Sequence, residues 1–263
     1  MNAFFDSVAF LPPPCSYSRS LPSLRFLGEI AYADLEPRAA AAELPLIFFC
    51  HGNAEDLGQC VPALQLIADA ANARVVTLDY PGYGLSAGRA GHVAALAAAR
   101  DVLVHVRAEF APRSFVLMGR SLGSGPICRL ARECADAGTP PAALILLSAF
   151  VSAVRVAVPR WLWPVVALGP FRNVDELTYS HLKRARCGVD APVLFIHGRL
   201  DDVVPFVHGV TLCERVRSVE SRHTVASLWV AEADHNNIEH ALHSAGTPLE
   251  GVVAAFVKQH CAM

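Results

Sequence analysis

Continuous apolar runs recur along the chain and predict a set of buried strands. Six runs carry this pattern: PLIFFC ending at Cys50, RVVTLD ending at Asp79, SFVLMG ending at Gly119, AALILLS ending at Ser148, PVLFIHG ending at Gly198 and ASLWVAE ending at Glu232. A parallel strand that is buried on both faces has no polar face, so it shows no alternation. A looser alternation, RFLGEIAYADLE from Arg25, predicts an antiparallel strand or hairpin before the six runs.

Helical patterns separate these runs. Two examples are HVAALAAARDVLVHVRAEF from His92 and GSGPICRLARECADAG from Gly123. Strands and helices that alternate in this way predict an α/β fold, with a mostly parallel sheet covered by helices on both faces. In such sheets ligands bind outside the carboxyl ends of the strands, so we expect the chemistry to lie there.

The stretch FVLMGRSLGSGP, from Phe115 to Pro126, places a G-x-S-x-G pattern at one of these strand ends. In the nucleophile elbow with this pattern, a serine is held on a strained turn between a strand and a helix. Chance alone produces the pattern roughly once in ten chains of this length. Its position between a predicted strand and a predicted helix is what makes Ser121 a candidate nucleophile.

A serine hydroxyl needs a base, and the base needs an acid that orients it. Elbow hydrolases have these residues in the order serine, acid, histidine. HGRLDDVVP places Asp201 and Asp202 after the fifth apolar run, and DHNNIE places His235 after the sixth. The order and the sheet edge both fit a catalytic triad, although these residues alone leave the choice between the two aspartates open.

The oxyanion of such a reaction needs backbone N–H donors, usually one after the nucleophile and one from an early loop. Leu122 follows Ser121 and supplies the first candidate. CHGNAEDLGQ follows the first apolar run, and its Asn53 or Ala54 supplies the second. This chemistry requires neither a metal nor a cofactor.

Composition narrows the classes of partner and the cellular location that the chain could have. The 263 residues are 53% hydrophobic and 17% charged, with a formal net charge of −2, which favours a large core. No long Lys/Arg run is present, so nothing indicates a nucleic-acid partner. The eight cysteines form no C-x-x-C pair and suggest reduced thiols in a cytoplasmic protein. No apolar run reaches the 18 or so residues that span a bilayer.

We expect a Pro-rich lead-in over residues 1–23 and a single domain over residues 24–263. At about 150–190 the alternation breaks, and the apolar segment VPRWLWPVVALGPF predicts a lid-like insertion near the strand ends. Trp161, Trp163 and Phe171 are candidates for lining an acyl-chain groove or for dipping into a membrane interface. The alternative is that the segment packs as ordinary core.

Six ordered motifs carry a resemblance to a known family: HGNAEDLGQ, DYPGYGLSAG, GRSLGSGP, SAFVSAVRVAVP, IHGRLDDVVPFVHG and LWVAEADHNNIE. From about Leu11 onward the chain resembles the alpha/beta-hydrolase-domain-containing protein 17 family. The resemblance implies an alpha/beta-hydrolase fold and removal of S-palmitoyl groups from membrane-associated proteins. It also implies Ser121 as nucleophile, Asp201 as acid and His235 as base.

The chain departs from the family at three points. The family carries a palmitoylated N-terminal cysteine cluster, whereas here only Cys15 lies in that region, and one acyl chain gives marginal membrane binding. We therefore expect a cytoplasmic protein with at most peripheral membrane contact. Asp234 replaces a glycine before the histidine, and Arg120 replaces a glutamine-like residue in the elbow. Two other functions remain open: a carboxylesterase or lipase acting on small esters or lipids, and an inactive hydrolase scaffold.

Overall fold

One mixed sheet forms the centre of the molecule. The computed structural model describes residues 6, 7, 9–39, 43–156, 160–162, 169–180, 183–220 and 222–261. The strands are β1 (Leu24–Leu27), β2 (Ile30–Leu35), β3 (Leu46–Cys50), β4 (Arg74–Leu78), β5 (Phe115–Arg120), β6 (Ala143–Leu147), β7 (Val193–Gly198) and β8 (Val225–Val230). The expected hairpin near Arg25 is confirmed as β1 and β2, and the six apolar runs are confirmed as β3 to β8.

The strand order is β1-β2-β4-β3-β5-β6-β7-β8. β1 and β2 pair antiparallel, as do β2 and β4, and all other neighbours are parallel. The carboxyl ends of β3 to β8 therefore meet at one edge of the sheet. That edge is where the predicted site residues follow their strands.

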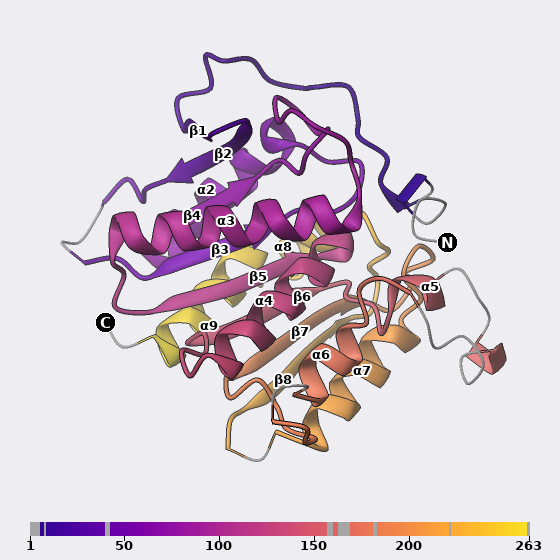
Figure 1. Cartoon of the computed structure of the whole chain (residues 1–263). Helices are drawn as coiled ribbons and strands as arrows, with labels where there is room; N and C mark the ends of the chain where they lie inside the picture. Colours follow the sequence, from indigo (N-terminus) through magenta and orange to yellow (C-terminus); the bar gives the residue numbers. More distant parts are fainter. Residues whose placement is uncertain are drawn as a thin grey trace.

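Helices lie on both sides of the sheet, as Figure 1 shows. The main helices are α2 (Leu57–Ala71), α3 (His92–Phe110), α4 (Ser124–Asp136), α6 (Asn173–Thr178), α7 (Val207–Arg217), α8 (Ile238–Ser244) and α9 (Leu249–His260). Residues of α3, α4, α6 and α7 share one core cluster, whereas residues of α2, α8 and α9 share the other. Alternate residues of each central strand join opposite clusters: Leu117 packs with the first and Met118 with the second. Burial on both faces explains why the strands read as continuous apolar runs.

The segment between β6 and β7 contains α5 (Ala153–Val156), the 3₁₀ turn η2 (Arg160–Leu162) and α6. Leu177 of α6 is fully buried in the core cluster that includes α4 and α7. This part of the segment belongs to the helix layer, and the expected lid-like insertion stays a prediction. Trp163 lies outside the described residues, so its expected place in an acyl groove stays a prediction.

No helix in the described part of the chain combines the length and the apolar character needed to cross a membrane.

Candidate active site

Ser121 stands on a left-handed turn between β5 and α4. Its φ is +49°, in a backbone region that residues other than glycine rarely adopt. The 3₁₀ turn η1 (Ser121–Gly123) then leads directly into α4. A Cβ at Gly119 would lie 2.8 Å from the carbonyl oxygen of Gly123, so only glycine allows so sharp a turn here. The backbone geometry is that of the predicted nucleophile elbow.

Asp201 and His235 meet across the loops that follow β7 and β8. His235 Nδ1 lies 2.9 Å from Asp201 Oδ2 and 3.0 Å from Oδ1. Gly198 permits this approach, because a Cβ there would lie 2.3 Å from the carbonyl oxygen of Ala233. Asp202 is exposed. The geometry therefore agrees with Asp201 as the acid that orients the imidazole.

Asp201 is held as an anion by further donors. Its carboxylate accepts the backbone N–H groups of Val203 at 3.1 Å and Val204 at 2.7 Å, and His197 Nε2 lies 3.2 Å away. Burial alone would raise the pKa of this carboxyl, but the hydrogen bonds from His197 and His235 outweigh it and hold the pKa well below its usual range. Asp201 is therefore ionised at neutral pH, as an acid that stabilises an imidazolium must be.

His197 also contacts Asp201 and is not one of the predicted site residues. His197 lies in β7, four residues before Asp201, and its side chain is buried. Its Nε2 faces the carbonyl oxygen of Val204 at 2.9 Å as well as the carboxylate, so Nε2 carries the proton. The i, i+4 spacing in IHGRLD is a signal that could have indicated this contact.

Ser121 and His235 are both largely buried, and their side chains do not form a hydrogen bond with each other in the described structure. Ser121 is 8% exposed, as is His235. Among the described residues no hydrogen bond joins the Ser121 hydroxyl to the His235 imidazole. In hydrolases without substrate this bond is often long and tightens when the substrate binds.

The turn after β3 packs directly against the elbow. A Cβ at Gly123 would lie 2.0 Å from the carbonyl oxygen of Cys50 and 2.6 Å from that of His51. Ala54 has a φ of +55°, and Asn53 Oδ1 accepts the Leu11 N–H at 2.9 Å. The turn is thus brought beside Leu122, the neighbour of Ser121. This arrangement fits the two predicted oxyanion donors.

The N-terminal lead-in contacts the end of the turn after β3, where α2 begins. The Ser16 N–H donates to Asp56 Oδ2 at 2.6 Å, and the Ser16 hydroxyl donates to the other carboxylate oxygen. The Tyr17 hydroxyl donates to Asp79, whose Oδ1 accepts the Leu57 N–H at 3.0 Å. Cys15 is exposed beside these anchors. The lead-in therefore contributes to the shape of the site.

Asp234, which replaces the family's glycine, closes the histidine loop through its side chain. Asp234 Oδ1 accepts the N–H groups of Asn236 at 2.8 Å and Asn237 at 3.1 Å. The Asp234 N–H donates to Asn237 Oδ1 at 2.9 Å. Asp234 does not have a positive φ. Hydrogen bonds of the Asx type therefore close the loop, and Asp234 needs no left-handed backbone.

A buried histidine behind the site gives the fold an expected sensitivity to acid. His208 Nδ1 accepts the N–H of Val151 at 3.2 Å. Burial, together with the nearby His197 and Arg155, lowers the pKa of His208 to about 4. An unfolded histidine has a pKa of about 6.5, so between these values the unfolded chain binds a proton that the folded chain does not. The contribution of His208 to the free energy of unfolding is complete above about pH 6.5 and is lost as the pH falls toward 4.

We expect His208→Gln to weaken this dependence. The difference in unfolding free energy between pH 7 and pH 4.5 should shrink by about 2 kcal/mol. Urea unfolding of both proteins at the two pH values measures the effect, and any loss of stability common to both pH values cancels. An unchanged pH dependence would show that His208 titrates normally in the folded protein.

Comparisons with known proteins show the family of this chain. The family described as serine aminopeptidase, S33, matches residues 42–174. Mouse alpha/beta hydrolase domain-containing protein 17C is 34% identical over 208 residues, which are 77% of this chain and 58% of that protein. Human alpha/beta hydrolase domain-containing protein 17B is 32% identical over 195 residues, 73% of this chain and 61% of that protein. The matches thus span little more than half the length of these relatives.

Solved structures support the fold. An esterase from Pyrococcus furiosus superposes with a TM-score of 0.66 at 14% identity, covering 95% of this chain and 99% of that chain. At this identity the likeness shows the fold alone. The family match and the relatives confirm the resemblance that the motifs predicted: the chain belongs to the alpha/beta hydrolases of the serine aminopeptidase S33 family and is related to alpha/beta hydrolase domain-containing protein 17.

Proposed function

We propose that this alpha/beta hydrolase is a serine hydrolase that cleaves acyl thioesters, with S-palmitoyl groups of membrane-associated proteins as its substrates. The observation that carries the proposal is the left-handed elbow at Ser121 beside a formed pair of His235 and Asp201. The resemblance to the protein 17 family supports the thioester as the substrate bond.

In the acylation step, the Ser121 hydroxyl attacks the thioester carbonyl carbon while His235 Nε2 takes its proton. The carbonyl oxygen becomes an oxyanion, and the backbone N–H groups of Leu122 and of Asn53 or Ala54 are its proposed donors. Asp201 keeps the imidazole in the tautomer with the proton on Nδ1 and stabilises the imidazolium. The carbon–sulfur bond then breaks, the thiolate takes the proton from His235, and an acyl-serine remains.

Water completes the cycle by the same groups. His235 removes a proton from water as the water oxygen attacks the acyl-serine carbon. The second tetrahedral intermediate collapses, the Ser121 oxygen recovers the proton from the imidazolium, and the fatty acid leaves. No group is oxidised or reduced.

Apolar side chains beside Asp201 and in the insertion suit a long acyl chain. Leu200 and Val203 lie within two residues of Asp201 and are 60% and 50% exposed, and Trp161 of the insertion between β6 and β7 is 76% exposed. The ring of Phe171 packs on Gly125 at the start of α4, where a Cβ would lie 2.4 Å from it. Each buried methylene group of a chain contributes about 0.8 kcal/mol. Exposed apolar residues around the catalytic edge also suit contact with a membrane surface, to which an acyl group on Cys15 would add.

Labelling and a matched substrate panel test the proposal. The protein should react with a fluorophosphonate probe, and it should hydrolyse a palmitoyl thioester faster than a palmitoyl oxygen ester with the same head group. Faster cleavage of the oxygen ester would identify a carboxylesterase or lipase. Absence of both labelling and turnover would identify an inactive scaffold.

Trp161→Ala should impair the cleavage of long chains selectively. If this exposed indole covers part of the acyl chain, kcat/KM for a sixteen-carbon substrate should fall roughly tenfold, equivalent to about two buried methylene groups. The four-carbon substrate should be cleaved at an unchanged rate, and the melting temperature should not move. Leu66→Ala removes an apolar side chain on α2 that is 50% exposed and serves as the control. Equal losses of kcat/KM on both substrates would show that Trp161 does not bind the acyl chain.

A further inference from the structure

Arg120 precedes Ser121 and ends β5. Its side chain lies on the same face of the sheet as that of Met118, two residues earlier, and therefore on the side covered by α2 and α9. The side chain is only 19% exposed. A partly buried guanidinium needs partners for its charge and its N–H groups.

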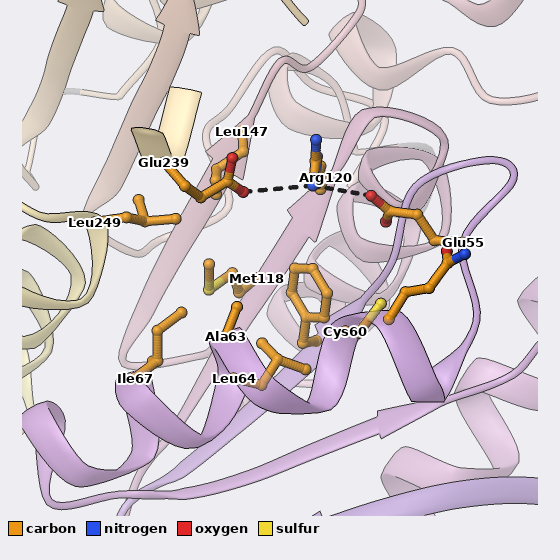
Figure 2. Close-up of a pocket in the computed structure, with 12 residues that line it drawn as sticks. Glu55, Cys60, Ala63, Leu64, Ile67, Met118, Arg120, Leu147, Glu239 and Leu249 are labelled. Atoms are coloured by element: carbon orange, nitrogen blue, oxygen red, sulfur yellow. Dashed lines mark hydrogen bonds and ion pairs between the residues drawn. The ribbon is translucent and has the colours of Figure 1, made fainter. Parts of the chain in front are cut away.

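Three acceptors surround this guanidinium, and Figure 2 shows two of them, the carboxylates of Glu55 and Glu239. Arg120 Nη1 lies 2.8 Å from Glu55 Oε1 and 3.4 Å from Glu239 Oε1. Arg120 Nη2 donates to the backbone carbonyl oxygen of His235 at 3.3 Å. The planar fork of arginine allows these contacts at the same time, which the single ammonium of lysine cannot reproduce.

Each acceptor lies in, or directly after, a loop that the proposed reaction uses. Glu55 Oε2 accepts the Gly52 N–H at 2.8 Å, so Glu55 closes the turn that contains Asn53 and Ala54. Glu239 lies in the first turn of α8, just after His235. The guanidinium thus connects the turn of the proposed oxyanion donors, the serine elbow and the histidine loop.

The space beside the guanidinium is hollow. A pocket of about 120 Å³ opens between α2 and α9. Figure 2 shows its apolar lining next to Arg120; the lining includes Phe49, Cys60, Leu64, Ile67, Met118 and Leu249. A packed core transmits the position of one element to another, whereas a void loses those contacts. Beside this pocket, the turn after β3 and the segment from His235 into α8 are therefore connected through the ion pairs and the hydrogen bond of Arg120.

We infer that Arg120 is a positioning residue for the proposed hydrolysis, which fixes the oxyanion turn and the histidine loop relative to Ser121. This inference rests on the proposed function. Arg120 acts through Glu55, Glu239 and the His235 carbonyl, on the side of the sheet opposite α4, and does not contact the reacting atoms. Because a misplacement of about 1 Å can cost on the order of 10²-fold in rate, its loss should appear in kcat.

Arg120→Gln tests the inference on p-nitrophenyl butyrate, whose short chain avoids effects on acyl binding. We expect kcat to fall about 10- to 100-fold while KM changes less than about twofold. Arg120→Lys should give an intermediate kcat, because it restores a charge but not the fork. Arg100→Gln is the control: Arg100 pairs with Glu133 through two bonds of 2.9 and 2.7 Å, between α3 and α4. Its kcat should stay at the wild-type value.

Melting temperatures of all variants separate positioning from folding. If Arg120→Gln does not fold, Glu239→Gln replaces it, because it leaves the Glu55 pair and the bond to the His235 carbonyl intact and removes only the ion pair to α8; kcat should then fall several-fold. Wild-type kcat in Arg120→Gln, or in Glu239→Gln where that variant replaces it, would overturn the inference while the proposed function stands. A wild-type protein with neither labelling nor turnover would overturn the proposed function itself.

Discussion

Replacing Ser121 with alanine is expected to abolish fluorophosphonate labelling and to lower turnover by on the order of 10⁶-fold. The loss is large because the three members of a triad act as a unit, and without the nucleophile the base has no proton to take. Turnover on a palmitoyl thioester and in-gel labelling measure the two effects. The remaining rate should reflect only substrate binding and the oxyanion donors.

Ser152→Ala is a matched control. Ser152 follows β6 and is 8% exposed, the same fraction as Ser121, so the two substitutions remove hydroxyls of equal burial. Ser152→Ala should label normally. Labelling of Ser121→Ala at the wild-type level would exclude Ser121 from the mechanism.

Asp201→Asn is expected to lower kcat by about 10⁴-fold, whereas Asp202→Asn should have a mild effect. The asparagine amide cannot accept the Nδ1 proton at both positions that the carboxylate offers, so it favours the wrong tautomer of His235. It also loses the charge that stabilises the imidazolium. Asp202 is exposed, and in the described part of the chain the hydrogen-bond partner of His235 Nδ1 is Asp201.

Kinetics of the two variants at pH 7.5 compare the adjacent aspartates directly. Both substitutions keep the size of the side chain, so a difference between them reflects the carboxylate and not the volume. A severe loss in Asp202→Asn with a mild one in Asp201→Asn would show that the acid had been assigned one residue too early.

The central strands could be predicted because local pattern and burial agree. Leu46–Cys50 and Val193–Gly198 are buried along their whole length, so their sequences have no polar face to obscure the pattern. The placement of the candidate site residues could be predicted for a related reason. Ser121, Asp201 and His235 each follow a strand, and the parallel order of the sheet brings these strand ends to one edge.

Contacts between distant segments could not be predicted in the same way. The pairing of Arg120 with Glu55 and Glu239 joins three loops, and no local pattern specifies which charges meet. Tyr17 and Asp79 are likewise 62 residues apart. Such contacts depend on the final packing of the elements, which periodicity does not encode.

Peptide mapping after inactivation tests the central claim most directly. The protein is titrated with a fluorophosphonate until hydrolysis of a palmitoyl thioester stops, and it is then digested and analysed by mass spectrometry. The proposed mechanism predicts one phosphonyl group per protein, on the hydroxyl of Ser121, with the loss of activity proportional to its occupancy. A phosphonyl group on another residue, or full activity with Ser121 modified, would contradict it.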